Sequence, residues 1–182
     1  MKICLVGTHG IGKTSLVHSL IGELKSRGVN AGMLREFVRE CPLPIGTEEN
    51  NSAEAQMWVL LRQVQEEIEA EKKFDIVVCD RSVIDIYAYF LSVRKKFGSS
   101  AELDKIAEEI FKNWGKTYSH VFKLPPAFSA PEDNFRSASP EWQTEIDRLV
   151  NANISELGIE THDVPLASLR DRVDSVLNVV KF

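Results

Sequence analysis

The chain has 182 residues, 43% hydrophobic and 27% charged, with a formal net charge of −5. This length suits one domain with a sizeable core, and the apolar content excludes a disordered chain. No apolar run approaches the roughly 20 residues that a membrane-spanning helix needs. The acidic balance argues against a dedicated nucleic-acid surface. Cys4 and Cys79 fall in apolar runs, so we expect buried thiols in a cytoplasmic protein.

Strand-like apolar runs alternate with helical patterns along the chain. In chain order the sequence predicts a strand at 3–6, a helix at 13–27, a strand at 31–38, a helix at 52–73, a strand at 76–79, helices at 83–97 and 101–113, a strand at 120–124, a helix at 142–157, a weak strand at 159–164 and a helix at 166–180. The initial run is typical of a buried strand and not of a secretion signal. Strands separated by helices predict a parallel sheet with right-handed crossovers. We therefore expect one three-layer α/β domain over 1–182, with a central, mostly parallel sheet of five strands and a lid at about 126–140.

The turn between the first strand and the first helix matches the pattern G-x-x-x-x-G-K-[ST] from Gly7 to Thr14. Such a loop points successive N–H groups at a phosphate, in conformations that glycine adopts easily. Lys13 would neutralise the β- and γ-phosphates, and Thr14 would offer a hydroxyl to Mg²⁺. The pattern predicts a P-loop NTPase fold that binds ATP with Mg²⁺. The residues expected to bind the nucleotide are Gly7, Thr8, His9, Gly10, Ile11, Gly12, Lys13, Thr14 and Ser15.

His9 has two interpretations within this loop. Its imidazole contacts a phosphate, or it occupies a variable position that faces solvent, and the sequence favours the second.

Missing motifs narrow the class of nucleotide-binding protein. The strings Asn-Lys-x-Asp, Asp-x-x-Gly and Leu-Ser-Gly-Gly-Gln do not occur, which excludes Ras-like GTPases and ATP-binding-cassette proteins. Small-molecule kinases and simple ATPases remain. Asp80 ends a buried strand, where its carboxylate would lie beside the phosphate loop and hold Mg²⁺. Arg81 follows at the carboxyl edge of the sheet, where its guanidinium suits phosphoryl oxygens, although a helix cap followed by a surface cation would look the same.

These features resemble the deoxynucleoside kinase and thymidylate kinase group of P-loop kinases. They resemble still more closely the AAA-type ATP-binding family that includes the ribosylnicotinamide kinase domain. The resemblance covers nearly the whole chain. It is based on the Gly7-to-Thr14 loop, on the Arg35-Glu36-Phe37-Val38-Arg39-Glu40 segment after the second strand, on Gln56 and Gln63 in a helix, and on Asp80-Arg81-Ser82.

The resemblance implies roles for residues around the acceptor. Glu36 would be the general base that faces the acceptor hydroxyl, with Asp80 as the competitor for that role and a plain salt bridge to Arg35 or Arg39 as the alternative. Arg39 would approach the acceptor or its phosphate. Gln56 would recognise a base or an amide, because a side-chain amide donates and accepts hydrogen bonds together. Tyr87 and Tyr89 stay open between pocket and core.

A lid is implied by Asp133-Asn134-Phe135-Arg136, which resembles the Asp-Gly-x-Arg core of that family with asparagine in place of glycine. Arg136 would then be a lid cation whose closure excludes water, and a simple surface loop with a solvated arginine is the alternative.

The combined prediction is a kinase that uses ATP and Mg²⁺ to phosphorylate a small nucleoside- or nucleotide-like acceptor, with ATP hydrolysis as the fallback activity. A nucleotide-dependent switch or slow ATPase that acts through a protein partner is the alternative. The acceptor, the preference for ATP over GTP, the oligomeric state and the choice between Glu36 and Asp80 as base stay open. The expected catalytic residues are Lys13, Glu36, Asp80, Arg81 and Arg136; the expected acceptor-binding residues are Glu36, Arg39, Gln56 and Arg81; the expected metal ligands are Thr14 and Asp80.

Overall fold

A computed structural model describes residues 1–126 and 139–181 of the chain. It contains one sheet of five strands in the order β2-β3-β1-β4-β5, and every neighbouring pair is parallel. The strands are β1 Lys2–Val6, β2 Ala31–Leu34, β3 Ile76–Cys79, β4 His120–Lys123 and β5 His162–Asp163. The helices are α1 Lys13–Ser26, α2 Ala53–Glu71, α3 Val83–Phe97, α4 Ala101–Trp114, α5 Pro140–Leu157 and α6 Leu169–Leu177, with short 3₁₀ turns η1 Val38–Glu40 and η2 Gly115–Thr117. The predicted α/β class and five-stranded parallel sheet are confirmed.

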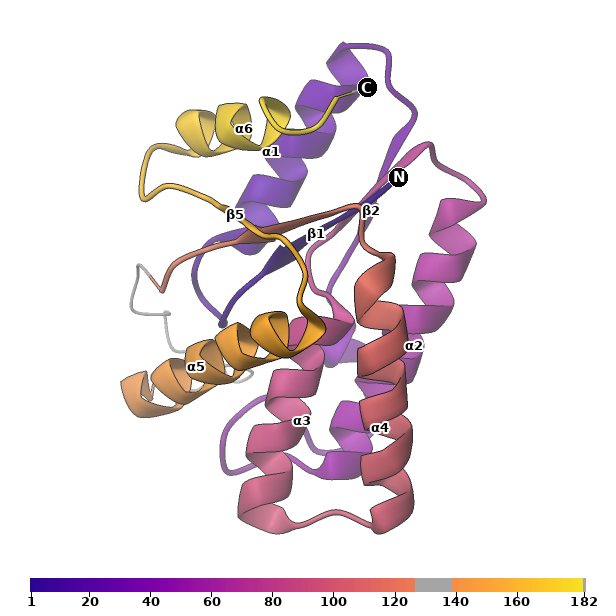
Figure 1. The fold of residues 1–182 in the computed structure, drawn as a ribbon, viewed down its shortest axis with the longest axis vertical. Coiled ribbons are helices and arrows are strands. Elements are labelled where there is room, and N and C mark those ends of the chain that lie inside the picture. Colours follow the sequence, from indigo (N-terminus) through magenta and orange to yellow (C-terminus); the bar gives the residue numbers. More distant parts are fainter. Residues whose placement is uncertain (127–138, 182) are drawn as a thin grey trace.

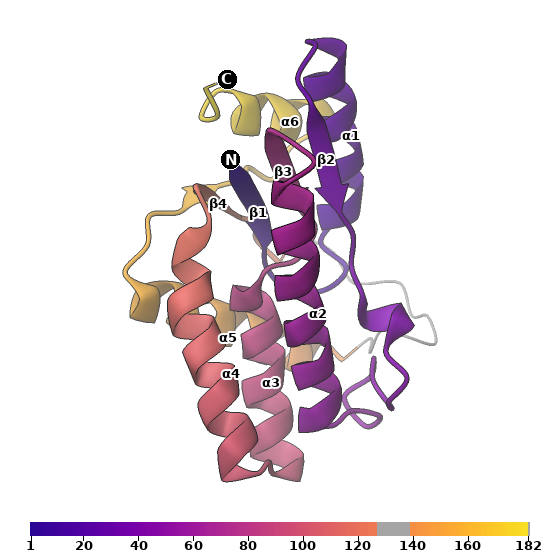
Figure 2. The same ribbon diagram turned by 90° about the vertical axis from the view of Figure 1, so that its right-hand side faces the viewer.

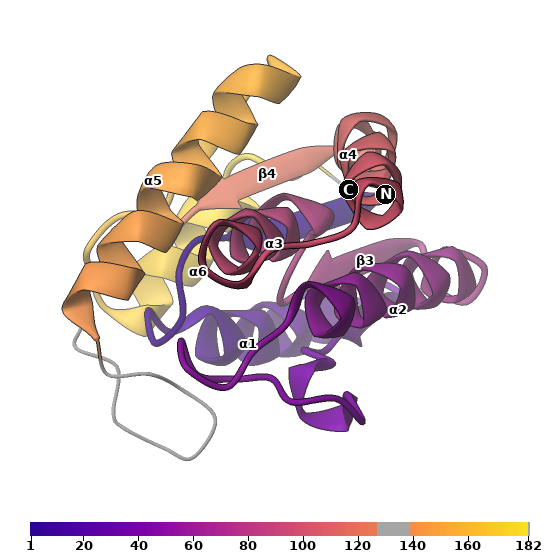
Figure 3. The same ribbon diagram turned by 90° about the horizontal axis from the view of Figure 1, so that it is seen from below.

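Helices cover both faces of the sheet, as an all-parallel sheet requires. On β1, Ile3 and Leu5 belong to the apolar cluster that includes α1 and α6, whereas Cys4 and Val6 belong to the cluster that includes α2, α3, α4 and α5. Figures 1 and 2 show this division, with α1 and α6 on one side of the strands. Seen from below in Figure 3, α3 lies between α5 and α4. The strands are thus buried from both sides, which explains their continuous apolar runs.

The helices begin in two different ways. The five helices after α1 each follow a serine whose hydroxyl accepts a backbone N–H of the first turn: Ser52, Ser82, Ser100, Ser139 and Ser168. In contrast, α1 follows Gly12, which has left-handed backbone and makes no side-chain cap. The first N–H groups of α1 are therefore left for another acceptor, and the positive end of the helix dipole adds to their attraction for an anion.

The second strand is shorter than predicted. β2 ends at Leu34 and not at residue 38, because its partner β3 ends at Cys79, the residue paired with Leu34. The backbone N–H of Asp80 still donates to the Leu34 carbonyl, over 2.9 Å, and beyond that point the segments that follow β2 and β3 separate. Glu36 therefore lies outside the sheet, beyond its carboxyl edge. The last strand and helix, β5 and α6, are likewise shorter than expected.

All five strands run in the same direction, so the segments that follow β1, β2 and β3 emerge at one edge of the sheet. The phosphate loop, Glu36 and Asp80 come from these three segments, and they meet there. Cys4 and Cys79 lie inside the neighbouring strands and are fully buried, as expected. Among the described residues, no helix combines the length and the apolar character that crossing a membrane requires.

Candidate active site

The phosphate loop has the backbone that its glycines predict. Gly7, Gly10 and Gly12 have φ angles of 143°, 76° and 81°, a region that residues with a side chain rarely adopt. At Gly7 a Cβ atom would also lie 2.5 Å from Cδ1 of Ile11 and 3.0 Å from the Leu124 carbonyl oxygen. The loop and the start of α1 line a cavity together with Glu36, Asp80 and Arg81. This cavity is the candidate nucleotide site.

Lys13 is buried at the start of α1, and its amino group turns back onto the loop. Nζ donates to the carbonyl oxygens of Gly7, over 2.9 Å, and of Thr8, over 2.6 Å. Burial, and after it the nearby Arg81 guanidinium, lower the pKa of Lys13 from 10.5 to about 8, against the opposing effect of the carboxylates of Asp85, Asp80 and Glu36. Without an anion beside it, the Lys13 charge is costly, and a bound phosphate would relieve that cost.

Thr14 and Asp80 provide the oxygen atoms of a candidate Mg²⁺ site. The Thr14 hydroxyl donates to Oδ2 of Asp80 over 2.7 Å, which joins the first turn of α1 to the end of β3. Burial raises the pKa of the Asp80 carboxyl, and the nearby Lys13 charge and the Thr14 hydrogen bond oppose that rise. A hydroxyl and a carboxylate beside a phosphate cradle are the hard oxygen ligands that Mg²⁺ prefers, so the two residues fit the ion.

Glu36 and Arg81 form a charge pair at the boundary of the nucleotide cavity. Nε of Arg81 lies 3.4 Å from Oε2 of Glu36. Burial alone would lower the pKa of the Arg81 guanidinium, but Glu36 and the groups of Tyr89, Asp85 and Asp80 raise it above its ordinary value. The guanidinium therefore stays charged, and it also lies 4.9 Å from the centre of the Tyr89 ring.

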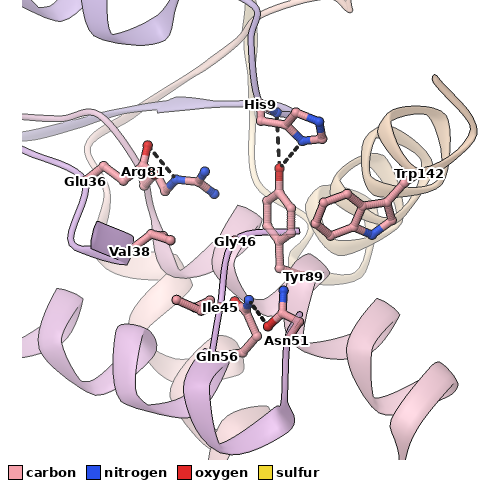
Figure 4. Close-up of a pocket in the computed structure, with 10 residues that line it drawn as sticks. All are labelled: His9, Glu36, Val38, Ile45, Gly46, Asn51, Gln56, Arg81, Tyr89 and Trp142. Atoms are coloured by element: carbon pink, nitrogen blue, oxygen red, sulfur yellow. Dashed lines mark hydrogen bonds and ion pairs between the residues drawn. The ribbon is translucent and has the colours of Figure 1, made fainter. Parts of the chain in front are cut away.

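A second, smaller cavity adjoins this charge pair (Figure 4). It shares His9, Glu36 and Arg81 with the nucleotide cavity. Its other lining residues come from the segment between β2 and α2, from α2, from α3 and from α5: Val38, Ile45, Gly46, Asn51, Gln56, Tyr89 and Trp142. An apolar and aromatic wall with a few convergent polar groups is typical of a small-molecule site.

Gln56 is buried in this second cavity, and Asn51 fixes its amide. Nε2 of Gln56 donates to Oδ1 of Asn51 over 2.9 Å (Figure 4). One N–H and the carbonyl oxygen of the Gln56 amide still have hydrogen-bonding capacity for a ligand. Gln56 thus lines the candidate acceptor cavity, and its predicted acceptor-binding role stays a prediction.

The solvent-facing interpretation of His9 is wrong, because the side chain is only 5% exposed. The Tyr89 hydroxyl accepts the His9 backbone N–H over 3.1 Å and lies 2.9 Å from Nδ1 of the ring. Trp142 of α5 packs beside the imidazole with 5.3 Å between ring centres, and Gln143 donates to the His9 carbonyl over 2.9 Å. Residues of α3 and α5, far away in sequence, therefore bury this position.

The two tyrosines that were left open have different surroundings. Tyr89 lines the second cavity, whereas Tyr87 stacks on Phe111 with ring centres 4.4 Å apart and belongs to the core. Arg39 is exposed on η1 and is not among the residues that line either cavity. Arg136 and the predicted lid core lie outside the described residues, so their role stays a prediction.

Arg172 of α6 is a contact of the phosphate loop that sequence reasoning missed. Its Nη2 donates to the Ile11 carbonyl oxygen over 3.2 Å, and its guanidinium lies against Gly12. In a trans peptide the C=O and the following N–H point in opposite directions. Holding the Ile11 carbonyl on the α6 side therefore directs the Gly12 N–H away from α6. A basic residue on an amphipathic helix gives no signal of this contact.

The pKa of Lys13 predicts how nucleotide binding depends on pH. Lys13 carries its charge below about pH 8 and loses it above, so ATP affinity should fall as the pH rises past this value, by up to about tenfold per pH unit. Calorimetric titration with ATP and Mg²⁺ from about pH 7 to about pH 9.5 measures the effect, with Lys13→Met as the control that should remove this slope. An equal slope in the control would assign the pH dependence to another group.

Comparisons with known proteins agree with this arrangement. A family model described as an AAA domain matches residues 2–172. A search among curated proteins finds no match. The fold is similar to that of deoxyadenosine kinase from M. mycoides with bound dATP, with a TM-score of 0.71, 14% identity and 98% of both chains covered. It is also similar to thymidylate kinase from Ehrlichia chaffeensis, with a TM-score of 0.65, 16% identity, and 100% of this chain and 98% of that chain covered.

A third similar structure is that of NadR in complex with NR, with a TM-score of 0.72 and 19% identity. The match covers 99% of this chain but 52% of the NadR chain, so this chain spans about half of that protein. At these identities the three likenesses show a shared fold. Because the family model covers nearly all of the sequence, the chain belongs to the AAA-domain family, with the fold of P-loop kinases.

Proposed function

We propose that this protein is a Mg²⁺-dependent kinase that transfers the γ-phosphoryl group of ATP to a hydroxyl of a small nucleoside-like acceptor. The observation that carries the proposal is the meeting of two cavities at Glu36 and Arg81. One cavity has the phosphate loop, and the other has an aromatic wall and a fixed amide. Phosphoryl transfer requires mainly that donor and acceptor are held in line and that charge is neutralised, and this arrangement supports both.

In the proposed reaction, the acceptor hydroxyl attacks the γ-phosphorus. A new P–O bond forms while the bond to the β–γ bridging oxygen breaks, ADP leaves, and the hydroxyl proton passes to the Glu36 carboxylate. Lys13 would neutralise the transferring group, and Arg81 would contact its oxygens from the acceptor side. Thr14 and Asp80 would hold Mg²⁺, which would supply charge neutralisation for the phosphate groups.

Glu36 is favoured over Asp80 as the base. Asp80 already accepts the Thr14 hydrogen bond and lines the nucleotide cavity, but it is not among the residues that line the acceptor cavity. Glu36 lines both cavities, so its carboxylate can reach a group that enters from the acceptor side. A metal ligand must lie beside the phosphates and a general base beside the acceptor hydroxyl. Asp80 suits the first position and Glu36 the second.

The acceptor is proposed to be a nucleoside and not a nucleotide. Glu36 and Arg81 are the full charges among the described residues lining the acceptor cavity, and they face each other. A phosphate monoester carries nearly two negative charges, and burying it beside this neutral pair would leave its charge uncompensated. Arg39, the extra cation expected for such a group, is not among the cavity-lining residues. A neutral sugar with hydroxyl groups fits better beside a charge pair whose net charge is zero.

An acceptor panel tests the proposal. ATP consumption is measured with Mg²⁺ and one nucleoside or nucleoside monophosphate at a time, and the phosphorylated product is identified by mass spectrometry. At least one nucleoside should raise ATP consumption by about tenfold or more over the acceptor-free rate and be converted in equal amount. The same slow rate with every acceptor would instead support a switch or slow ATPase, and stimulation only by monophosphates would reassign the acceptor class.

A further inference from the structure

A buried carboxylate outside both cavities joins several elements behind the active site. Glu67 of α2 is 0% exposed, and four donors from the chain around it bind its two oxygens. Oε2 lies 2.9 Å from Nζ of Lys2 and accepts the indole N–H of Trp114 over 2.6 Å. Oε1 accepts the Tyr118 hydroxyl over 2.7 Å and Nε2 of Gln63 over 2.8 Å. We refer to these five residues as the Glu67 cluster.

Two members of the Glu67 cluster also bind the backbone that follows β3. The Gln63 amide nitrogen, which has two N–H groups, donates to the Arg81 carbonyl over 2.9 Å as well as to Glu67. The Tyr118 hydroxyl donates to Glu67 and accepts the Val83 N–H over 3.0 Å. The segment from Arg81 to Val83 is thus bound to one carboxylate at both of its ends. The Arg81 side chain leaves this same segment and enters the acceptor cavity.

Burying the charges of Glu67 and Lys2 costs free energy, and the ion pair and hydrogen bonds within the Glu67 cluster offset that cost. Lys2 is 1% exposed, and its amino group lies 4.6 Å from the Trp114 ring centre and 5.0 Å from that of Tyr118. Apolar residues of similar volume would often stabilise such a core equally well. What a satisfied buried network adds is a fixed geometry, because hydrogen bonds to a charged acceptor are stronger and each partner restricts the others.

We propose that the Glu67 cluster positions Arg81 for phosphoryl transfer, with Gln63 and Tyr118 as the positioning residues. The inference depends on the proposed kinase activity, since it assigns a role in that reaction. Gln63 holds the carbonyl of Arg81 and Tyr118 holds the N–H of Val83. The backbone therefore cannot shift without breaking one of these bonds or pulling Gln63 or Tyr118 away from Glu67. Because the backbone of Arg81 is fixed in this way, its side chain is held with the guanidinium opposite Glu36 and beside Tyr89.

The test compares two variants that each remove one donor to Glu67. Gln63→Met also removes the bond to the Arg81 carbonyl, whereas Trp114→Phe leaves both bonds to the segment after β3 in place. We expect both variants to melt at a lower temperature than the unchanged protein. Of these two, Gln63→Met should lose kcat, by about tenfold with little change in KM for ATP, while Trp114→Phe should keep kcat within about twofold. Tyr118→Phe should resemble Gln63→Met.

Amide hydrogen exchange at Ser82 gives a readout that does not need activity. The Ser82 N–H shares a peptide unit with the Arg81 carbonyl and donates to Oδ1 of Asp85 over 2.7 Å, so it exchanges only when this segment opens. Exchange should be about tenfold faster in Gln63→Met than in Trp114→Phe. Equal kcat in the two variants, or equal exchange at Ser82, would overturn the positioning role and leave the Glu67 cluster with a role in stability alone. If no acceptor stimulates the unchanged protein, the proposed kinase activity fails, and Ser82 exchange still decides whether the cluster fixes this segment.

Discussion

Replacing Lys13 with alanine is expected to lower kcat for phosphoryl transfer by roughly 10²–10³-fold, because the variant lacks the cation that neutralises the transferring group. The amino group lies within the phosphate loop, on the carbonyls of Gly7 and Thr8, and lines the nucleotide cavity. The rate is measured with the best acceptor of the panel at saturating ATP and Mg²⁺.

The fold should survive the Lys13→Ala change. Burial lowers the pKa of Lys13, which means that the folded protein holds the charged amino group less favourably than the unfolded chain does. Removing it should therefore leave the melting temperature unchanged or raise it. Lys25→Ala, in the exposed last turn of the same helix, is the matched control and should keep full activity. Full activity in Lys13→Ala with a normal melting temperature would contradict the assignment of the phosphate loop.

The parts of the site that the sequence predicts are those built from contiguous residues. Gly7 to Thr14 are neighbours in the chain, and the glycine positions follow from the backbone conformation that the loop requires. The run 76–79 is apolar at every position because helices cover both of its faces, so the strand could be located and Asp80 placed at its end. Parallel strands then bring Asp80 next to the loop by topology alone, as the hydrogen bond from Thr14 shows.

The acceptor cavity could not be predicted because it depends on how helices are rotated against the sheet. Asn51, Tyr89 and Trp142 come from a loop and two helices, and no spacing in the sequence relates them. His9 was assigned to solvent for the same reason, since Tyr89 and Trp142 bury it across long sequence separations. A one-dimensional pattern records which face of a helix is apolar, but not which loop that face meets.

The buried charges of Glu67 and Lys2 could not be predicted for a different reason. Glu67 lies on an amphipathic helix beside other acidic residues, and Lys2 precedes the apolar run of β1, so both are typical of solvated positions. Trp114 and Tyr118 supply further partners for Glu67 from other parts of the chain, and Gln63 supplies one from the same helix. The sequence contains every member of this network but gives no indication that they meet.

Replacing Glu36 with glutamine is expected to lower kcat by about 10²–10⁴-fold, the usual effect of losing a general base. The amide keeps the size of the side chain but cannot take up the acceptor proton. The affinity for ATP and the dependence of the rate on Mg²⁺ should change little, because the proposed ligands of the ion are Thr14 and Asp80 and not Glu36. Steady-state kinetics with the best acceptor, over a range of Mg²⁺ concentrations, separate these effects.

Two further variants sharpen the test. Glu40→Gln removes a carboxylate from the same segment, one that pairs with the exposed Arg35 over 2.5 Å, and should keep normal kinetics. Asp80→Asn should instead raise the Mg²⁺ concentration needed for half-maximal rate, because it weakens an oxygen ligand of the ion. If Glu36→Gln loses less than about threefold while Asp80→Asn abolishes transfer even at saturating Mg²⁺, the base is Asp80. Glu36 lines both cavities, whereas Asp80 lines only the nucleotide cavity. We therefore expect Glu36→Gln to lower kcat through loss of the proton acceptor, and Asp80→Asn to raise the Mg²⁺ requirement through loss of a metal ligand.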